Sequence, residues 1–298
     1  MVNGIIIVDK EPGFTSHDVV AKLRGICGQK KIGHTGTLDP MATGVLPVCL
    51  GSGTRLCDML TDRDKEYVAE LLLGVETDTQ DTTGQVLMQR PVRVEEADVR
   101  AACESFLGEY EQIPPMYSAL KIDGKRLYEL ARAGKEVERK ARPVRILELE
   151  ILEYRLPVVK LRVVCSKGTY IRTLCADIGD RLGFGGTMQS LRRTAVGQFT
   201  LKKALTLGEL QQRKDAGRLE EIVLPVDSVF QDCPALHVSG ENLRLLDNGN
   251  AIHPQQTEEK IRHESGRWVR FYRADGSFAG IYAYDGQSRW YRPVKMFL

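Results

Sequence analysis

The stretch GHTGTLDPMATGVLPVCLG, at residues 33–51, says more about the fold and function of this chain than any other. Its first twelve residues hold three glycines, one proline and several small hydroxyl side chains, which is typical of a loop. Asp39 precedes Pro40, so its backbone is biased toward the extended region. A carboxylate presented on such a loop can act as a nucleophile or a base, although an Asp-Pro pair more often caps a turn.

Signatures of other chemistries are missing from the sequence. No Lys-Ser/Thr pair follows the glycines, so the loop is not a Walker phosphate loop, and the zinc deaminase pattern is also missing. The seven cysteines form no C-x-x-C pair, and the five histidines form no H-x-x-x-H pair. We therefore expect neither a metal site nor a disulfide framework.

The segments on either side of the loop show strand-like and helix-like patterns. Residues 4–9 are β-branched and bounded by Gly and Pro, which predicts a short buried strand. Ser16 precedes an apolar stripe at helical spacing, which predicts a helix over 17–27 with Ser16 as its cap. Further strands are expected at 65–75, 144–154 and 158–166, and further helices at 95–107 and 170–182.

Strands and helices are interspersed without a regular βαβ alternation, so the predicted fold class is α+β with a mixed sheet. A length of 298 residues suits one large domain or two smaller ones. A domain boundary is expected near 225–240, within a stretch that carries no Lys or Arg and contains Pro234. The remainder, 237–298, is rich in glycine and short β-type runs, and it is expected to form a small all-β module.

Arg172 and Tyr67 are further candidates for a functional site. Arg172 lies in the first turn of the predicted helix 170–182, at the flank of its apolar stripe. The helix dipole disfavours a cation there, so a partly buried arginine calls for a carboxylate or phosphate partner; an exposed arginine covering apolar surface is the alternative. Tyr67 shares a strand face with Ala69 and Leu71, which is typical of the core, but such a ring can also stack on a base.

Charge is unevenly distributed along the chain. Residues 61–112 carry a net charge of −8, whereas residues 118–218 carry +11. Eight Lys/Arg lie between positions 121 and 142, against four acids. This distribution favours an anionic partner for the middle of the chain, and a phosphate-tracking surface at 121–142 is one candidate beside an ordinary solvated face.

Five ordered stretches resemble the TruB family of tRNA pseudouridine synthases, and they run through the whole predicted catalytic region. They are GHTGTLDPMATGVLPVCLG (33–51), KEYVAELLLGVETDTQDTTG (65–84), IPPMYSALKIDGKRLYELARAG (113–134), CSKGTYIRTLCADIGDRLG (165–183) and LRRTAVGQF (191–199). The C-terminal part, opening with HVSGENLRLLDNGNAI, is less specifically similar to a PUA domain. One departure is FGGTM at 184–188, where family members commonly have a Cys-Gly-Ala-His-like run.

The resemblance implies a role for each of five residues. Asp39 is the catalytic aspartate, and Arg172 pairs with it and keeps it ionised by lowering its pKa. Tyr67 stacks on the target base, and Leu191 forms part of the apolar wall of the pocket. His34 occupies the space that the nucleotide vacates when it leaves the stack.

The resemblance also implies a domain organisation and an activity. A pseudouridine-synthase catalytic domain with a mixed, largely antiparallel sheet flanked by helices spans 1–236, and 113–143 is an insertion that contacts RNA. A PUA-like RNA-binding domain spans 237–298. The reaction is the isomerisation of uridine 55, in the T loop of tRNA, to pseudouridine. It needs no cofactor and no metal.

The expected partner is the tRNA T stem-loop, with no protein partner, no membrane and a monomeric, cytoplasmic enzyme. Three alternatives remain open. A glycoside hydrolase would need a second carboxyl about 5–10 Å from Asp39. A non-catalytic tRNA-binding or folding protein would not need Asp39 and Arg172 together. An RNA-guided pseudouridine synthase is less favoured, because the chain has no long Lys-rich tail.

Overall fold

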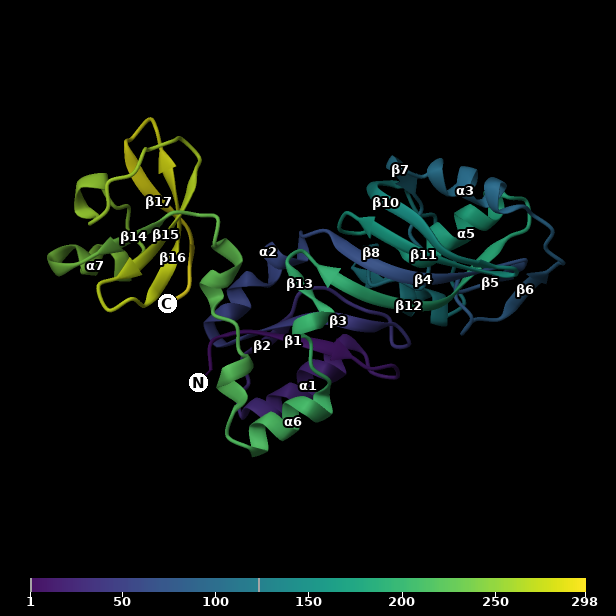
Figure 1. Cartoon of the computed structure of the whole chain (residues 1–298), viewed down its shortest axis with the longest axis horizontal. Helices are drawn as coiled ribbons and strands as arrows, with labels where there is room; N and C mark the ends of the chain where they lie inside the picture. Colours follow the sequence, from purple (N-terminus) through teal and green to yellow (C-terminus); the bar gives the residue numbers. More distant parts are fainter. Residues whose placement is uncertain (1, 123) are drawn as a thin grey trace.

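A computed structural model describes residues 2–122 and 124–298 (Figure 1). The helices are α1 (Ser16–Cys27), α2 (Cys57–Thr61), α3 (Glu96–Glu104), α4 (Leu127–Arg132), α5 (Ile171–Arg181), α6 (Leu207–Asp215) and α7 (Leu243–Asp247). The strands are β1 (Gly4–Lys10), β2 (Ile32–His34), β3 (Thr43–Leu50), β4 (Lys65–Leu73), β5 (Val75–Thr77), β6 (Val86–Gln89), β7 (Gly108–Gln112), β8 (Lys121–Ile122), β9 (Lys125–Arg126), β10 (Arg142–Arg155), β11 (Val158–Cys165), β12 (Gly186–Val196), β13 (Phe199–Thr200), β14 (Ala235–Val238), β15 (Trp268–Arg273), β16 (Phe278–Asp285) and β17 (Trp290–Met296).

Nine strands form one large sheet with the order β1-β3-β12-β4-β11-β10-β7, while β2 pairs with β3 and β13 with β12. Every neighbouring pair is antiparallel except β3 and β12, where Arg193 lies opposite Gly44. Gly44 has φ +102°, and a Cβ at this position would collide with the carbonyl oxygen of Arg193, so only glycine fits. The predicted α+β class with a mixed, largely antiparallel sheet is confirmed.

The first helix begins one residue earlier than its sequence pattern predicts. Thr15, not Ser16, is the N-cap: its hydroxyl accepts a hydrogen bond from the amide of Asp18 at 3.1 Å, and the Asp18 carboxylate accepts one from the Thr15 amide at 2.8 Å. Ser16 is buried, and its hydroxyl instead accepts a hydrogen bond from the amide of Leu38 at 2.9 Å. The predicted cap is therefore wrong by one residue, because Ser16 serves the loop that carries Asp39.

The other predicted elements form, with shifted ends. The strand expected over 65–75 ends at Leu73, because Gly74 adopts φ +80° and turns the chain into β5. The helix expected over 95–107 ends at Glu104. The helix expected over 170–182 is α5, whose predicted stripe is buried at Ile171, Leu174, Cys175 and Ile178.

Helices pack on different parts of the sheet, as Figure 1 shows. α5 packs on β12 and β4, and α3 packs on β10. Apolar side chains of both helices share one core cluster with Tyr67, Ala69 and Leu71. α1 and α6 lie side by side against β1 and β3. The catalytic candidates lie between these two halves, near the parallel β3–β12 pair.

The C-terminal residues form a separate four-stranded sheet with the order β14-β15-β16-β17. This sheet lies at one end of the molecule (Figure 1), and the five-residue helix α7 adds to the expected all-β module. The boundary predicted between 236 and 237 falls inside β14, whose first residue, Ala235, already pairs with Arg270. The module also shares a core with the rest of the chain, because Phe297 and Ile281 pack in one cluster with Phe230.

Candidate active site

The loop between β2 and β3 carries Asp39 and is anchored on both sides of that residue. Before it, the amide of Leu38 donates to Ser16 of α1 at 2.9 Å. After it, the carbonyl of Pro40 accepts hydrogen bonds from Lys10 Nζ at 2.9 Å and from the amide of Gly13 at 3.0 Å. These hydrogen bonds attach the loop to β1 and α1, and they fix the backbone position of Asp39.

Arg172 approaches Asp39 along one edge of its guanidinium. Nε lies 3.0 Å from Oδ2 and Nη2 lies 3.4 Å from Oδ1, so two donors face the two carboxylate oxygens. The arginine is only 5% exposed, whereas the side chain of Asp39 is 39% exposed. The carboxylate partner that the sequence requires for this arginine is therefore present, and the free side of the carboxylate faces outward.

The remaining donors of Arg172 contact two other segments. Nη1 donates to the carbonyl of Thr79 at 3.1 Å and lies 3.6 Å from Asp81 Oδ2, while Nη2 also donates to the carbonyl of Tyr117 at 2.8 Å. Asp81 is a residue that sequence reasoning missed. Its place in DTQDTTG (78–84), a polar segment with two aspartates within the stretch 65–84, could have identified it as a candidate.

Burial raises the pKa of the Asp39 carboxyl above its ordinary value of 3.8, and the Arg172 charge offsets this only in part. The nearby Asp81 raises it further, and Lys10 lowers it. Burial raises the pKa of Asp39 by more than the Arg172 charge lowers it. Arg172 still acts in the predicted direction, since its charge favours the ionised form.

Arg193 of β12 pairs with Tyr67 of the neighbouring strand β4 on one side and with Gly44 of β3 on the other. Tyr67 is 8% exposed and belongs to the core cluster that also contains Leu38. Burial raises the pKa of its hydroxyl, and the adjacent charge of Arg193 opposes that rise. The ring thus lies beside the loop of Asp39, in a row of residues that crosses three strands.

Two buried cations near this row were not predicted. Lys10 is fully buried, and burial lowers its pKa to about 8. Arg193 is 1% exposed and donates from Nε to the carbonyl of Val45 at 2.7 Å, while its Nη2 has no hydrogen-bond partner within residues 2–122 and 124–298. Neither residue stands out in the sequence, because a single cation at a strand end is usually solvated.

Leu191 and His34, the two remaining predicted site residues, lie on β12 and at the end of β2. Leu191, on β12 opposite Ala69, packs against the same core cluster as Tyr67 and remains half-buried. His34 ends β2 and contacts the ring of His17 edge-on, with centroids 5.1 Å apart, and burial lowers its pKa. Leu191 therefore packs with the cluster that contains Tyr67, whereas His34 lies where the loop of Asp39 begins.

The predicted insertion 113–143 contributes to the site through its backbone and its charges. The Tyr117 carbonyl binds Arg172, as described above. Further along, Tyr128 lies between two cations, with Arg126 5.7 Å and Arg132 5.5 Å from its ring centroid. Most Lys and Arg side chains of this segment are exposed. The described part of the insertion therefore presents an exposed basic surface and reaches the catalytic candidates through the Tyr117 carbonyl.

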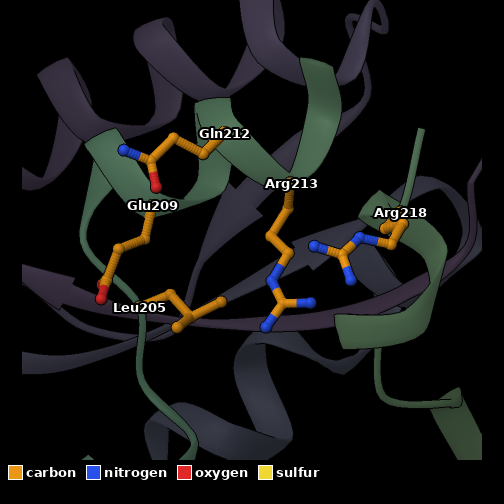
Figure 2. A pocket seen from close by; sticks show the side chains of 5 residues that line it. All are labelled: Leu205, Glu209, Gln212, Arg213 and Arg218. Atoms are coloured by element: carbon orange, nitrogen blue, oxygen red, sulfur yellow. The ribbon is translucent and has the colours of Figure 1, made fainter. Parts of the chain in front are cut away.

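The structure was also searched for other kinds of site. Among the described residues, no three His, Cys, Asp or Glu side chains gather as metal ligands would, and no helix is long and apolar enough to cross a membrane. Figure 2 shows a pocket of about 250 Å³ on α6, lined by Leu205, Glu209, Gln212, Arg213 and Arg218. None of the predicted site residues lines it.

Comparisons with known proteins identify the family of the chain. Residues 24–171 match the model of the TruB family pseudouridylate synthase N-terminal domain, and residues 172–231 match that of the tRNA pseudouridylate synthase B C-terminal domain. The chain is 50% identical to tRNA pseudouridine synthase B of Lachnoclostridium phytofermentans over the full length of both proteins. The chain belongs to the TruB family. It is also 48% identical to the Alkaliphilus oremlandii enzyme of that name, over 91% of this chain and 90% of the relative.

Solved structures of lower sequence identity share the fold of this chain. A crystal structure of a Cbf5–Nop10–Gar1 complex superposes on 99% of this chain and 85% of the matched chain, with a TM-score of 0.74 and 27% identity. An H/ACA ribonucleoprotein bound to a substrate RNA containing 2′-deoxyuridine gives a TM-score of 0.73 at 26% identity. The pseudouridine-synthase fold predicted for this chain is confirmed.

Proposed function

We propose that this chain isomerises uridine 55, in the T loop of tRNA, to pseudouridine, with Asp39 as its catalytic group. Family membership supports the reaction, and the relatives that are 42–50% identical carry the name tRNA pseudouridine synthase B. The observation that carries the assignment to Asp39 is its contact with Arg172. A carboxylate with both oxygens held by a buried arginine and one side exposed is suited to act on a substrate from that side.

The reaction breaks the C1′–N1 bond, turns the uracil and joins C5 to C1′. An ionised carboxylate serves each of three routes: attack at C1′, attack at C6, or removal of the C2′ proton. Arg172 fixes the orientation of Asp39 in all three. Tyr67 supplies a ring on which the base stacks after leaving the helix, Leu191 forms the apolar wall, and His34 occupies the vacated space.

Two rival functions have less support. A glycoside hydrolase needs a second carboxyl as a proton donor, and Asp81 is the candidate that the fold brings near. Its Oδ1 already accepts hydrogen bonds from Thr79 Oγ1 and from the amide and hydroxyl of Thr83, and its Oδ2 faces Arg172. Asp81 is thus engaged as an acceptor. An RNA-guided enzyme is less supported, because the Cbf5 structures are only 26–27% identical.

The remaining parts of the chain fit a stand-alone tRNA enzyme. Residues 1–236 would form the catalytic domain and 113–143 its RNA-contacting insertion, while 237–298 would form the PUA-like RNA-binding domain. We expect a cytoplasmic monomer that needs no protein partner, no metal and no cofactor. Its partner is the T stem-loop of tRNA, which the exposed cations of the insertion would contact through phosphates.

Unmodified tRNA transcript, incubated with the purified chain, tests this function. Carbodiimide mapping is expected to find pseudouridine at position 55 after treatment with the wild type and no pseudouridine after treatment with Asp39→Asn. Release of free uracil would instead identify a hydrolase. Binding without any product would identify a non-catalytic tRNA-binding protein.

A further inference from the structure

The loop that joins β5 to β6 contains a residue in an unfavourable backbone conformation. Gln80 has φ +61°, and within residues 2–122 and 124–298 only Arg289 is another non-glycine residue with positive φ. The left-handed region costs a residue such as glutamine about 1–2 kcal/mol. Such strain persists where the surrounding structure imposes it, and it occurs most often at functional sites.

Three hydrogen bonds hold Gln80 in this conformation. Its amide donates to the carbonyl of Thr77 at 3.2 Å, and its carbonyl accepts from the amide of Met188 at 3.0 Å. Its side-chain Oε1 accepts from the hydroxyl of Thr173 at 2.7 Å. Thr173 lies on α5 and is 2% exposed, so the donor of this bond is buried, and the bond links the turn to the helix.

The residues on either side of Gln80 both contact Arg172, which the carbonyl of Tyr117 also binds. The carbonyl of Thr79 accepts from Nη1 at 3.1 Å, and the carboxylate of Asp81 lies 3.6 Å from the same nitrogen. Consecutive residues of α5 thus contact one turn: Arg172 binds Thr79 and Asp81, and Thr173 binds Gln80. The opposite edge of the Arg172 guanidinium faces Asp39.

We propose that Gln80 and Thr173 are positioning residues for the reaction, because their hydrogen bond fixes the 79–81 turn that aligns Arg172 with Asp39. The inference rests on the proposed function of Asp39. Neither residue contacts the Asp39 carboxylate, and both act through Arg172. A guanidinium held on three sides can meet a carboxylate with two donors in one geometry only, so a looser turn would let that geometry drift.

The experiment compares Thr173→Val with Thr173→Ser. Valine keeps the shape of threonine without its hydroxyl, whereas serine keeps the hydroxyl. Thr173→Val is expected to lower the single-turnover rate on tRNA by about tenfold or more and to leave the tRNA KM within about twofold. Thr173→Ser is expected to stay close to the wild-type rate. A Thr173→Val rate equal to that of the wild type would overturn the proposal.

A second readout does not depend on turnover. Carbon-13 NMR titration follows the Asp39 carboxyl, whose signal is assigned from its loss in Asp39→Asn. Because the Arg172 charge favours ionised Asp39, Thr173→Val should raise the pKa of Asp39 above that of the wild type, and Thr173→Ser should not. An unchanged pKa of Asp39 in Thr173→Val would contradict the proposal. A wild type that is inactive on tRNA would instead contradict the proposed function, and the pKa measurement would still test the positioning role.

Gln80→Gly separates positioning from a purely structural role. Glycine adopts positive φ without strain, so this variant should unfold at the same or a higher temperature than the wild type. It lacks Oε1, so it should be slowed like Thr173→Val, and the double variant should be no slower than either single one. A stable Gln80→Gly enzyme with the wild-type rate would show that Gln80 serves only the turn.

Discussion

The side chains of Asp39 and Arg172 meet across 133 residues of sequence, with Nε of Arg172 3.0 Å from Oδ2 and Nη2 3.4 Å from Oδ1. The carboxylate comes from the loop between β2 and β3, and the guanidinium comes from the first turn of α5. The guanidinium is buried and has further acceptors in the carbonyls of Thr79 and Tyr117. The pair therefore joins four segments at one point, and a change in its geometry would disturb their contacts with Arg172.

Arg172→Lys is expected to reduce the single-turnover rate to well below a third of the wild-type value. A lysine keeps the charge, but a single ammonium cannot offer donors to both oxygens of Asp39 and to two carbonyls in the same plane. Rapid-quench measurement on tRNA transcript checks the rate, and circular dichroism checks that the variant is folded. A folded lysine variant with more than about a third of wild-type activity would contradict the role of the paired contact.

Asp39→Asn is expected to abolish isomerisation while tRNA affinity stays within about tenfold of the wild type. Asparagine has nearly the shape of aspartate but is neither a nucleophile nor a base at neutral pH. Filter binding measures the affinity, and a long single-turnover incubation measures any residual conversion. Conversion by a preparation free of wild-type enzyme would rule out Asp39 as the catalyst.

The acid limb of the pH–rate profile is expected to lie above the ordinary range of an aspartate. Burial raises the pKa of Asp39 above 3.8, and only the ionised form reacts, so kcat/KM falls as the pH falls through this raised pKa. Measurements of kcat/KM for the wild type between pH 4 and 8, within the range where circular dichroism shows a folded protein, check this. A kcat/KM that shows no acid limb within this range would show that the charge of Arg172 prevails over burial.

Local patterns predicted α1, α3, α5, β1, β4, β10 and β11, but not the central strands β3 and β12. The helix α5 was predictable because an apolar stripe such as Ile171, Leu174 and Ile178 is buried together only in a helix. Arg172 was also predictable, since a half-buried cation at a helix N-terminus requires a partner. Lys10 and Arg193 were not, because their burial results from the packing of distant strands. The positive φ of Gln80 was equally hidden, since glutamine has no preference for that conformation.

The N-terminus of α1 also depends on a tertiary contact that the sequence does not reveal. Thr15 and Ser16 are both good N-cap residues, and the sequence alone favoured Ser16. The tertiary structure assigns the hydroxyl of Ser16 to the amide of Leu38, beside Asp39, and leaves the capping to Thr15. A local rule gave the right helix and the wrong cap, because the choice depends on a contact 22 residues away.

Tyr67→Phe and Tyr67→Ala are expected to separate the ring of Tyr67 from its hydroxyl. Phenylalanine keeps the stacking face, so tRNA affinity should stay near that of the wild type. Alanine removes it, and binding should weaken by about 1–3 kcal/mol. Because Tyr67 is buried, thermal unfolding of both variants must accompany the binding measurement. Equal affinities in two folded variants would return Tyr67 to an ordinary core role.

The junction between the two parts of the chain is expected to be structural. Phe297 is 5% exposed and contacts Phe278 and Phe230, with ring centroids 5.4 Å and 6.2 Å away. Phe297→Ala should therefore lower the free energy of unfolding by about 3–5 kcal/mol. Urea denaturation measures this. For the same reason, cutting the chain after residue 236 exposes apolar core and is a poor test of RNA binding.

Trp290 offers a test of tRNA binding by the C-terminal module in the full-length chain. Its side chain is 37% exposed and contacts the edge of His253, whereas Trp268, with a similar exposure of 38%, lies against Phe230 in the junction. If the module stacks on the tRNA, Trp290→Ala should raise the tRNA KM by at least about fivefold, because one stacked base is worth about 1–3 kcal/mol. Its turnover at saturating tRNA should stay within about threefold of the wild type, because the site of chemistry is remote. Trp268→Ala is the matched control, which should lower the unfolding temperature and leave the KM near that of the wild type. A Trp290→Ala enzyme with unchanged stability and unchanged KM would show that this tryptophan does not contact the substrate.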